Sequence, residues 1–117
     1  MLSVHHINAV LVIAVCVSAG VGALLARRRQ AAGRTLTHVI ALAQTLVVAQ
    51  VLLGLVLLSE HKRAADRLHY AYGMFALLAV FAPLVYAPAE PRSRLLWFGI
   101  ALLVGSALGV RAYMTAT

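Results

Sequence analysis

Four long apolar stretches follow one another along the chain, separated by three short charged segments. The stretches cover residues 7–26, 36–59, 68–87 and about 95–112, and they contain no Asp, Glu, Lys or Arg ahead of Arg111. A helix needs about 20 apolar residues to cross the hydrocarbon core of a bilayer. Its backbone polar groups must then bond within the helix, because lipid offers no partner. The pattern therefore predicts four membrane-spanning helices.

The connecting segments are so short that consecutive helices must run antiparallel. We therefore predict an all-α fold, a four-helix transmembrane bundle with up-down-up-down topology. A single membrane domain is expected to cover residues 1–117, with the lipid bilayer as its surroundings.

The composition agrees with this fold and removes other classes of protein. Hydrophobic residues make up 63% of the chain and charged residues 11%, which is too little polar surface for a water-soluble domain of 117 residues. The net charge of +7 does not indicate nucleic-acid binding, because the basic residues form short clusters between apolar stretches, as they do at membrane surfaces. No nucleic-acid partner is expected.

The positions of Lys and Arg predict the orientation in the membrane. Six basic residues belong to the first and third connecting segments: Arg27, Arg28, Arg29, Arg34, Arg92 and Arg94. Four belong to the second segment and the C-terminus: Lys62, Arg63, Arg67 and Arg111. Since the more basic loops stay on the cytoplasmic side, we expect an integral protein of a prokaryotic plasma membrane with both termini outside.

The apolar stretches carry no acidic side chain, and this argues against two kinds of chemistry. A proton-coupled exporter needs a carboxylate within the membrane, and a Ser–His–Asp hydrolase needs one to orient its histidine. Histidine is the remaining candidate for a functional side chain, and five occur in the chain.

Three of the histidines are predicted to share one depth in the bilayer. His5 and His6 open the first helix, and His69 opens the third helix, which runs in the same direction. These helices can face each other across a four-helix bundle, so two imidazoles could ligate one haem iron from both sides. We expect a haem b held by His69 and His6, with His5 as the alternative to His6. Gly73, one turn after His69, would leave room for the flat macrocycle.

Simpler interpretations exist for the same residue types. Histidines at helix starts can lie among the lipid headgroups, and His38 and His61 are expected near the surface or in solvent. Gln44 and Gln50 lie within the second stretch, where amides usually hydrogen-bond across helices. A contact of these amides with a haem propionate or a quinone is the alternative.

Two motifs resemble one half of a haem A synthase. The second stretch contains QVLLGLVLL at residues 50–58, and the third begins with LHYAYG at residues 68–73. In that family each half is a four-helix bundle. It has a histidine at the outer start of one helix, then a Gln-x-x-Leu-Gly helix, then a second histidine at the outer start of the next helix.

The resemblance implies a haem site and a way of assembling. His6 or His5 matches the first ligand, His69 matches the second, and Gln50 and Gly54 match the Gln and Gly positions. Half-length members of the family assemble as oligomers, which implies a homo-oligomer here.

The chain departs from the family at the residues around the first histidine. The family has a Glu three residues before its histidine and an Arg just after it. This chain has Leu2 or Ser3 at the Glu position and His6 or Ile7 at the Arg position. We therefore expect haem binding without oxygenase chemistry, and not an enzyme that acts alone.

The sequence favours two functional hypotheses over a third, a synthase-like enzyme that acts as an oligomer. The first is an integral haem-binding protein similar to b-type cytochromes, in electron transfer or haem handling as a subunit or assembly factor of a respiratory complex. The alternative is a cofactor-free packing subunit of a larger membrane complex. The pairs Ser18 with Gly22 and Gly105 with Gly109 have the spacing of small residues at helix contacts. We expect them to pack within the chain; a dimer seam is the alternative.

Overall fold

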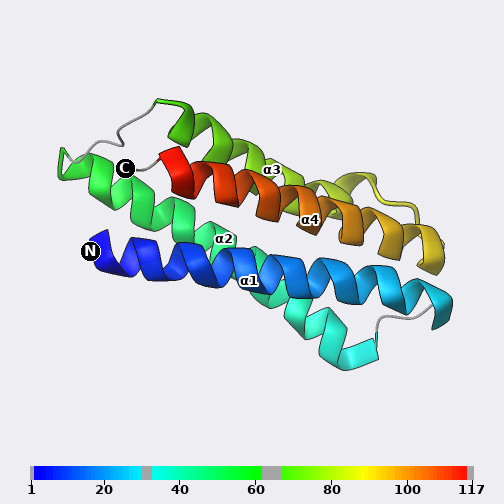
Figure 1. Cartoon of the computed structure of the whole chain (residues 1–117). Helices are drawn as coiled ribbons and strands as arrows, with labels where there is room; N and C mark the ends of the chain where they lie inside the picture. The colour runs from blue at the N-terminus through cyan, green and yellow to red at the C-terminus, as the bar shows by residue number, and fades with distance from the viewer. Residues whose placement is uncertain (1, 30–32, 62–66, 116–117) are drawn as a thin grey trace.

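The computed structural model describes residues 2–29, 33–61 and 67–115. Within these ranges it contains no strand and four α-helices: α1 (Leu2–Ala26), α2 (Gly33–Ser59), α3 (Leu68–Tyr86) and α4 (Pro91–Thr115) (Figure 1). A 3-10 turn, η1 (Arg27–Arg29), follows α1. The predicted all-α fold is confirmed, and each of the four helices is long and apolar enough to span a membrane. Lys62 and Arg63, on which the predicted orientation partly depends, lie outside the described residues.

The helices form an antiparallel bundle in which each helix has two neighbours. α4 packs along both α1 and α3, α2 packs on α1, and the contact between α2 and α3 is the smallest of the four. The backbones of α1 and α3 do not meet in the described ranges, so these helices lie diagonally across the bundle. α1 begins and α4 ends at the same end of the molecule (Figure 1), which is 47 Å long.

Glycines let α4 approach α1 closely. A Cβ atom on Gly99 would lie 2.6 Å from Cδ2 of Leu24 and 3.2 Å from the carbonyl oxygen of Gly20. The two helices therefore meet backbone to backbone at this point. In lipid, helix association depends on such close packing, because the apolar surface gains little from leaving the surrounding acyl chains.

The glycines that the sequence analysis singled out also face other helices of the same chain. A Cβ atom on Gly105 would lie 2.6 Å from Cγ1 of Val80 in α3, and one on Gly109 would lie 3.4 Å from Ile13 in α1. Gly22 faces α2. These three glycines therefore set contacts within the bundle, as predicted, whereas Ser18, which was expected to pack with Gly22, is exposed.

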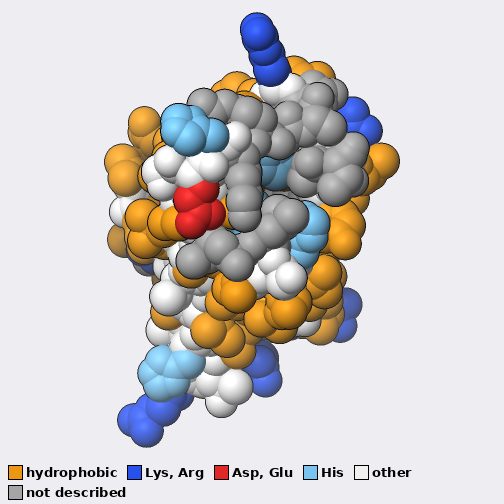
Figure 2. Space-filling view, turned by 90° about the vertical axis from the view of Figure 1, so that its left-hand side faces the viewer, with side chains coloured by type: hydrophobic (Ala, Val, Ile, Leu, Met, Phe, Trp, Pro, Cys, Tyr) orange, Lys and Arg blue, Asp and Glu red, His pale blue; other side chains and the backbone are white. Residues whose placement is uncertain are grey.

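The outer surface of the bundle is apolar. Cys16, Val80 and Leu102 are fully buried between the helices, whereas Leu25 is 62% exposed and Val85 is 76% exposed. Figure 2 views the end where α1 begins and shows hydrophobic side chains over the sides of the molecule. Such a surface is unfavourable in water and suits contact with acyl chains, so the chain is an integral membrane protein.

The fourth helix begins four residues before the apolar stretch that predicted it, at Pro91 instead of residue 95. Proline fits the first position of a helix because the missing N–H has no partner there. The Glu90 carboxylate accepts hydrogen bonds from the backbone N–H groups of Arg92, at 3.1 Å, and Ser93, at 2.7 Å. These polar contacts start the helix, and hydropathy does not detect them.

Replacing Gly105 by alanine is expected to destabilise the bundle by about 1–3 kcal/mol, because overpacking strains a filled core. The new methyl group would overlap Val80, whose β-branched side chain cannot easily turn away. Unfolding in mixed detergent micelles measures the change. Gly73→Ala is the control, since no heavy atom lies within 4 Å of that Cβ position. Equal stability of Gly105→Ala and the unchanged protein would contradict the close packing of α3 and α4.

The start of α4 is expected to depend on pH through Glu90. Hydrogen bonds from the Ser93 side chain, and then from the N–H groups of Ser93 and Arg92, hold the pKa of Glu90 below its ordinary value of 4.5. A lowered pKa means that the carboxylate stabilises this turn at neutral pH, and that the stabilisation is lost as the pH falls through the lowered pKa. An NMR titration of the Arg92 and Ser93 amide signals should show one transition below pH 4.5, absent from Glu90→Gln. A transition above that pH would contradict the cap.

Candidate functional site

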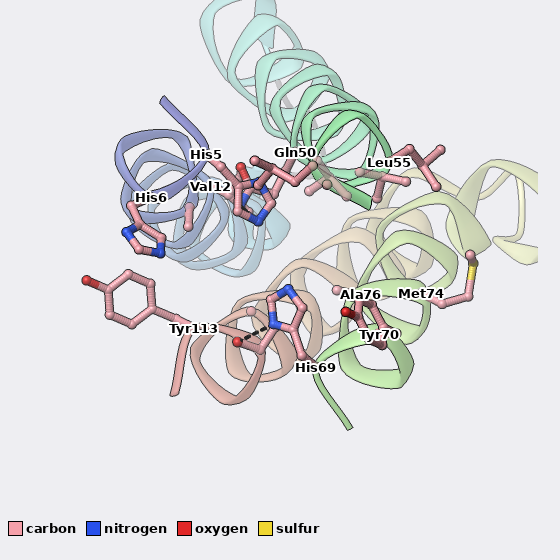
Figure 3. Close-up of a pocket in the computed structure, with 18 of the residues that line it drawn as sticks. His5, His6, Val12, Gln50, Leu55, His69, Tyr70, Met74, Ala76 and Tyr113 are labelled. Atoms are coloured by element: carbon pink, nitrogen blue, oxygen red, sulfur yellow. Dashed lines mark hydrogen bonds between the residues drawn. The ribbon is translucent and has the colours of Figure 1, made fainter. Parts of the chain in front are cut away.

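A cavity of about 600 Å³ lies among the four helices, near the end of the bundle where α1 begins (Figure 3). Small-molecule sites in proteins have volumes of about 300–1,000 Å³, so this cavity can hold a sizeable ligand. Val12 and Val47, both buried, close it toward the middle of the bundle. His5, His6 and His69 line it nearer the helix ends.

His5 is the most deeply buried of these histidines. It lies inside α1, because this helix begins at Leu2, five residues before the apolar stretch that starts at residue 7. Its side chain is only 7% exposed. The ring centroids of His5 and His69 are 6.2 Å apart, and the ring planes make an angle of 70°. Figure 3 shows the two rings opposite each other, one from α1 and one from α3. The structure therefore brings together one histidine from each of the two helices that lie diagonally across the bundle.

The backbone of α4 orients the ring of His69. The Nδ1 atom lies 2.6 Å from the carbonyl oxygen of Ala112. A carbonyl oxygen only accepts hydrogen bonds, so Nδ1 carries the hydrogen and Nε2 keeps its lone pair. Tyr70 packs edge-on against the same ring, with centroids 5.6 Å apart. His69 thus has the arrangement typical of a metal-binding histidine, whose second nitrogen donates to a carbonyl.

Gln50 of α2 lies beside His5 and is held in place by Asn8. The Nδ2 atom of Asn8 donates to the carbonyl oxygen of Leu46, at 3.1 Å, and to Oε1 of Gln50, at 2.9 Å. The Nε2 atom of Gln50 lies 3.4 Å from Nε2 of His5. The other ring nitrogen of His5, Nδ1, is buried and has no hydrogen-bond partner in the described structure. A buried polar atom without a partner costs about 1–3 kcal/mol, so the ring of His5 is incompletely satisfied in this orientation.

His6 lies on the adjacent side of α1. Its ring centroid is 6.1 Å from that of Tyr113 and 6.4 Å from that of His5. Consecutive residues of a helix project about 100° apart, so only one of the two histidines can point at the bundle diagonal. The packing of α1 turns His5 in that direction. The structure therefore brings His5 to His69, and His6, the preferred ligand of the sequence analysis, borders the cavity beside Tyr113 (Figure 3).

Glycines leave space beside the two rings, and the cavity opens toward lipid. A Cβ atom on Gly54 would lie 3.5 Å from Cε1 of His5, and no heavy atom lies within 4 Å of a Cβ atom on Gly73. The room expected at Gly73 is present. Leu55 and Met74 line the cavity and are 55% and 50% exposed. Leu55 of α2 and Met74 of α3, both labelled in Figure 3, therefore lie where the cavity reaches the outer surface, and Tyr113 of α4, 45% exposed, lies at another edge.

The other polar residues considered in the sequence analysis, Gln44, His38 and His61, do not line the cavity. Gln44 donates from Nε2 to the carbonyl oxygen of Val80, at 3.2 Å, and so bonds across helices, as Gln50 does. His38 and His61 are exposed and do not line the cavity. The sequence analysis missed Asn8. The available signal was a single amide in the first apolar stretch, three residues after His5 and therefore on the same helix face.

The chemistry that this arrangement permits is narrow. Among the described residues, no group of three or more His, Cys, Asp or Glu side chains could hold a metal ion. A metal between His5 and His69 would therefore need its other ligands from the group that carries it, as a porphyrin provides. No protein-family model, curated protein or solved structure matches the chain, so its function is inferred from the geometry of the cavity.

Proposed function

We propose that this protein binds one haem b within the membrane, with His5 of α1 and His69 of α3 as the axial ligands. The observation that carries the proposal is the approach of these two imidazoles to 6.2 Å between centroids, in a cavity of about 600 Å³ inside a membrane bundle. Histidines on facing helices are a recurrent way to hold a cofactor inside a four-helix bundle.

The residues present fit this group in three respects. A metal between two imidazole nitrogens, with bonds of about 2 Å, separates the ring centroids by roughly 6 Å. The ring of His5 is buried with one long hydrogen bond and one unpartnered nitrogen, so turning Nε2 from Gln50 to a metal sacrifices little. Gly73 leaves open space beside His69 for the edge of a flat macrocycle.

Haem b supplies one-electron chemistry when it is bound. The contribution of this chain is to hold the iron from both sides and to surround it with apolar side chains. Two imidazole ligands, from His5 and His69, would leave the iron no free position for oxygen, which favours electron transfer or haem handling over oxygenase chemistry. The resemblance to one half of a haem A synthase agrees with the haem site, and the absence of a Glu at Leu2 or Ser3 agrees with the lack of oxygenase chemistry.

We infer the location from the number of basic residues at each end of the bundle. The end of the bundle opposite the histidines carries the larger number of basic residues, so we place that end in the cytoplasm of a prokaryotic cell and both termini outside. The haem would then lie near the outer surface, where it could exchange electrons with another membrane subunit of a respiratory complex or with a second copy of this chain.

The cofactor-free alternative is less well supported by the packing. A packing subunit would use its small residues against a partner. Gly105 and Gly109 instead face Val80 and Ile13 of the same chain, whereas Ser18 is exposed and remains available to a partner.

Visible spectroscopy tests the two ligands. The protein, purified in detergent from cells supplied with haem, is expected to show sharp reduced-minus-oxidised bands at one haem per chain. His5→Ala and His69→Ala should lower the haem affinity more than about 100-fold, because even the hydrogen-bond partners of metal ligands contribute about 10–100-fold. His6→Ala is the matched control, one residue from His5 on the same helix, and should keep the bands.

Two outcomes would contradict the assignment. A colourless preparation with full helicity would remove the haem proposal. Bands that survive in His5→Ala and disappear in His6→Ala would make His6 the ligand.

Filling the cavity should also lower the haem affinity, without a change to either histidine ligand. Gly73→Leu places a branched side chain in the open space beside His69, and is expected to lower haem affinity at unchanged helicity. Ala107→Leu adds a side chain of the same size on an exposed position of α4 and should leave the affinity unchanged. Equal haem affinity of both variants would show that the macrocycle does not use this space.

A further inference from the structure

Asn8, Gln50 and His5 form a chain of hydrogen bonds next to the cavity. A backbone carbonyl at one end of this chain determines which atoms donate and which accept. The carbonyl oxygen of Leu46 can only accept, so the atom of Asn8 that faces it, 3.1 Å away, must be the amide nitrogen. The same nitrogen faces the side chain of Gln50 at 2.9 Å and supplies its second hydrogen there. Gln50 must therefore present its oxygen to Asn8.

The direction is passed on to His5. Because the oxygen of Gln50 is turned to Asn8, its amide nitrogen faces the ring of His5, 3.4 Å from Nε2. An amide nitrogen only donates, so Nε2 of His5 must accept, and it carries a lone pair instead of a hydrogen. In the neutral ring the hydrogen is then on Nδ1.

We propose that Asn8 is a positioning residue that acts through Gln50 to keep His5 in the tautomer whose Nε2 lone pair can bind iron. The inference rests on the proposed haem site. His69 is held in the same tautomer by the carbonyl oxygen of Ala112, which accepts from Nδ1 at 2.6 Å. Both ligands would thus offer Nε2, although one is oriented by a backbone carbonyl directly and the other through two amides.

The contact between Gln50 and His5 suits a temporary role. At 3.4 Å it is longer than the usual 2.7–3.2 Å of an N–H hydrogen bond, so it is weak. It is strong enough to select a tautomer in an apolar interior. In the other tautomer the N–H at Nε2 of His5 would face the N–H of Gln50, and neither group would have an acceptor. A metal that binds Nε2 displaces only this weak bond.

The tautomer can be measured without haem. Ring ¹⁵N signals of histidine-labelled protein in micelles distinguish a nitrogen with a hydrogen from one with a lone pair, and His5→Gln identifies the signals of His5. The unchanged protein is expected to carry the hydrogen on Nδ1. In Gln50→Glu an ionised carboxylate accepts from Asn8 with one oxygen and can only accept from His5 with the other. At a pH where this carboxylate is ionised, the hydrogen should therefore move to Nε2. Asn8→Leu frees the amide of Gln50 to turn, and a mixture of tautomers is expected.

Haem affinity gives the second readout. Gln50→Glu should bind haem about 10–100-fold more weakly, the usual effect of a changed partner of a metal ligand. Gln50→Leu removes the contact without blocking Nε2 and should bind at least about tenfold more tightly than Gln50→Glu. Asn8→Leu should give an intermediate loss, and should have no further effect on the tautomer in a Gln50→Leu background, because Asn8 acts through Gln50.

The outcomes separate the two proposals. If the unchanged protein carries the hydrogen on Nε2 of His5, or if neither Asn8→Leu nor Gln50→Glu shifts the tautomer, the role of Asn8 is overturned even where haem binds. If the tautomers shift as expected but no variant or parent binds haem, the haem site is overturned and the directed chain of hydrogen bonds stands. Asn8→Leu and Gln50→Leu introduce no charge into the membrane. They therefore still test the role of Asn8 if Gln50→Glu fails to fold.

Discussion

The close packing of α4 determines where the two histidine-bearing helices stand. Gly99 lets α4 touch the backbone of α1, and Gly105 lets it fit against Val80 of α3. α1 and α3 are thereby held on the bundle diagonal, where their backbones do not meet but His5 and His69 face each other. The same helix supplies the carbonyl oxygen of Ala112 that orients His69. The distance between the imidazoles is therefore set by a third helix, through contacts that leave little room for adjustment.

The apolar interior fixes which polar atoms donate and which accept hydrogen bonds. A buried donor without an acceptor, such as Nδ1 of His5, costs free energy, and a backbone carbonyl can only accept. Both histidines take their orientation from such a carbonyl, His69 from Ala112 and His5 from Leu46 by way of two amides. A charged side chain could orient a ring more strongly, but it would be costly to bury at this depth. Neutral amides give direction at a lower cost.

Hydropathy predicted the four helices because the thickness of the bilayer sets the length of an apolar stretch. It did not predict the start of α4, which depends on Pro91 and on capping by Glu90. The equal depth of His5 and His69 also followed from the antiparallel order. The sequence could not show whether His5 or His6 faces His69, because this depends on the rotation of α1 about its own axis. Contacts with α4, far away in the sequence, determine that rotation.

The weak contact between α2 and α3 gives the site its access. Gln44 ties α2 to Val80 of α3 deeper in the bundle, and of the four neighbouring pairs of helices α2 and α3 make the smallest contact. Leu55 and Met74 stand at the resulting opening and face both the cavity and the lipid. Under the proposed function, a flat apolar group dissolved in the bilayer would reach His5 and His69 sideways, without crossing the polar ends of the helices. The bundle would then be rigid where α4 spaces the ligands and open where the cofactor enters.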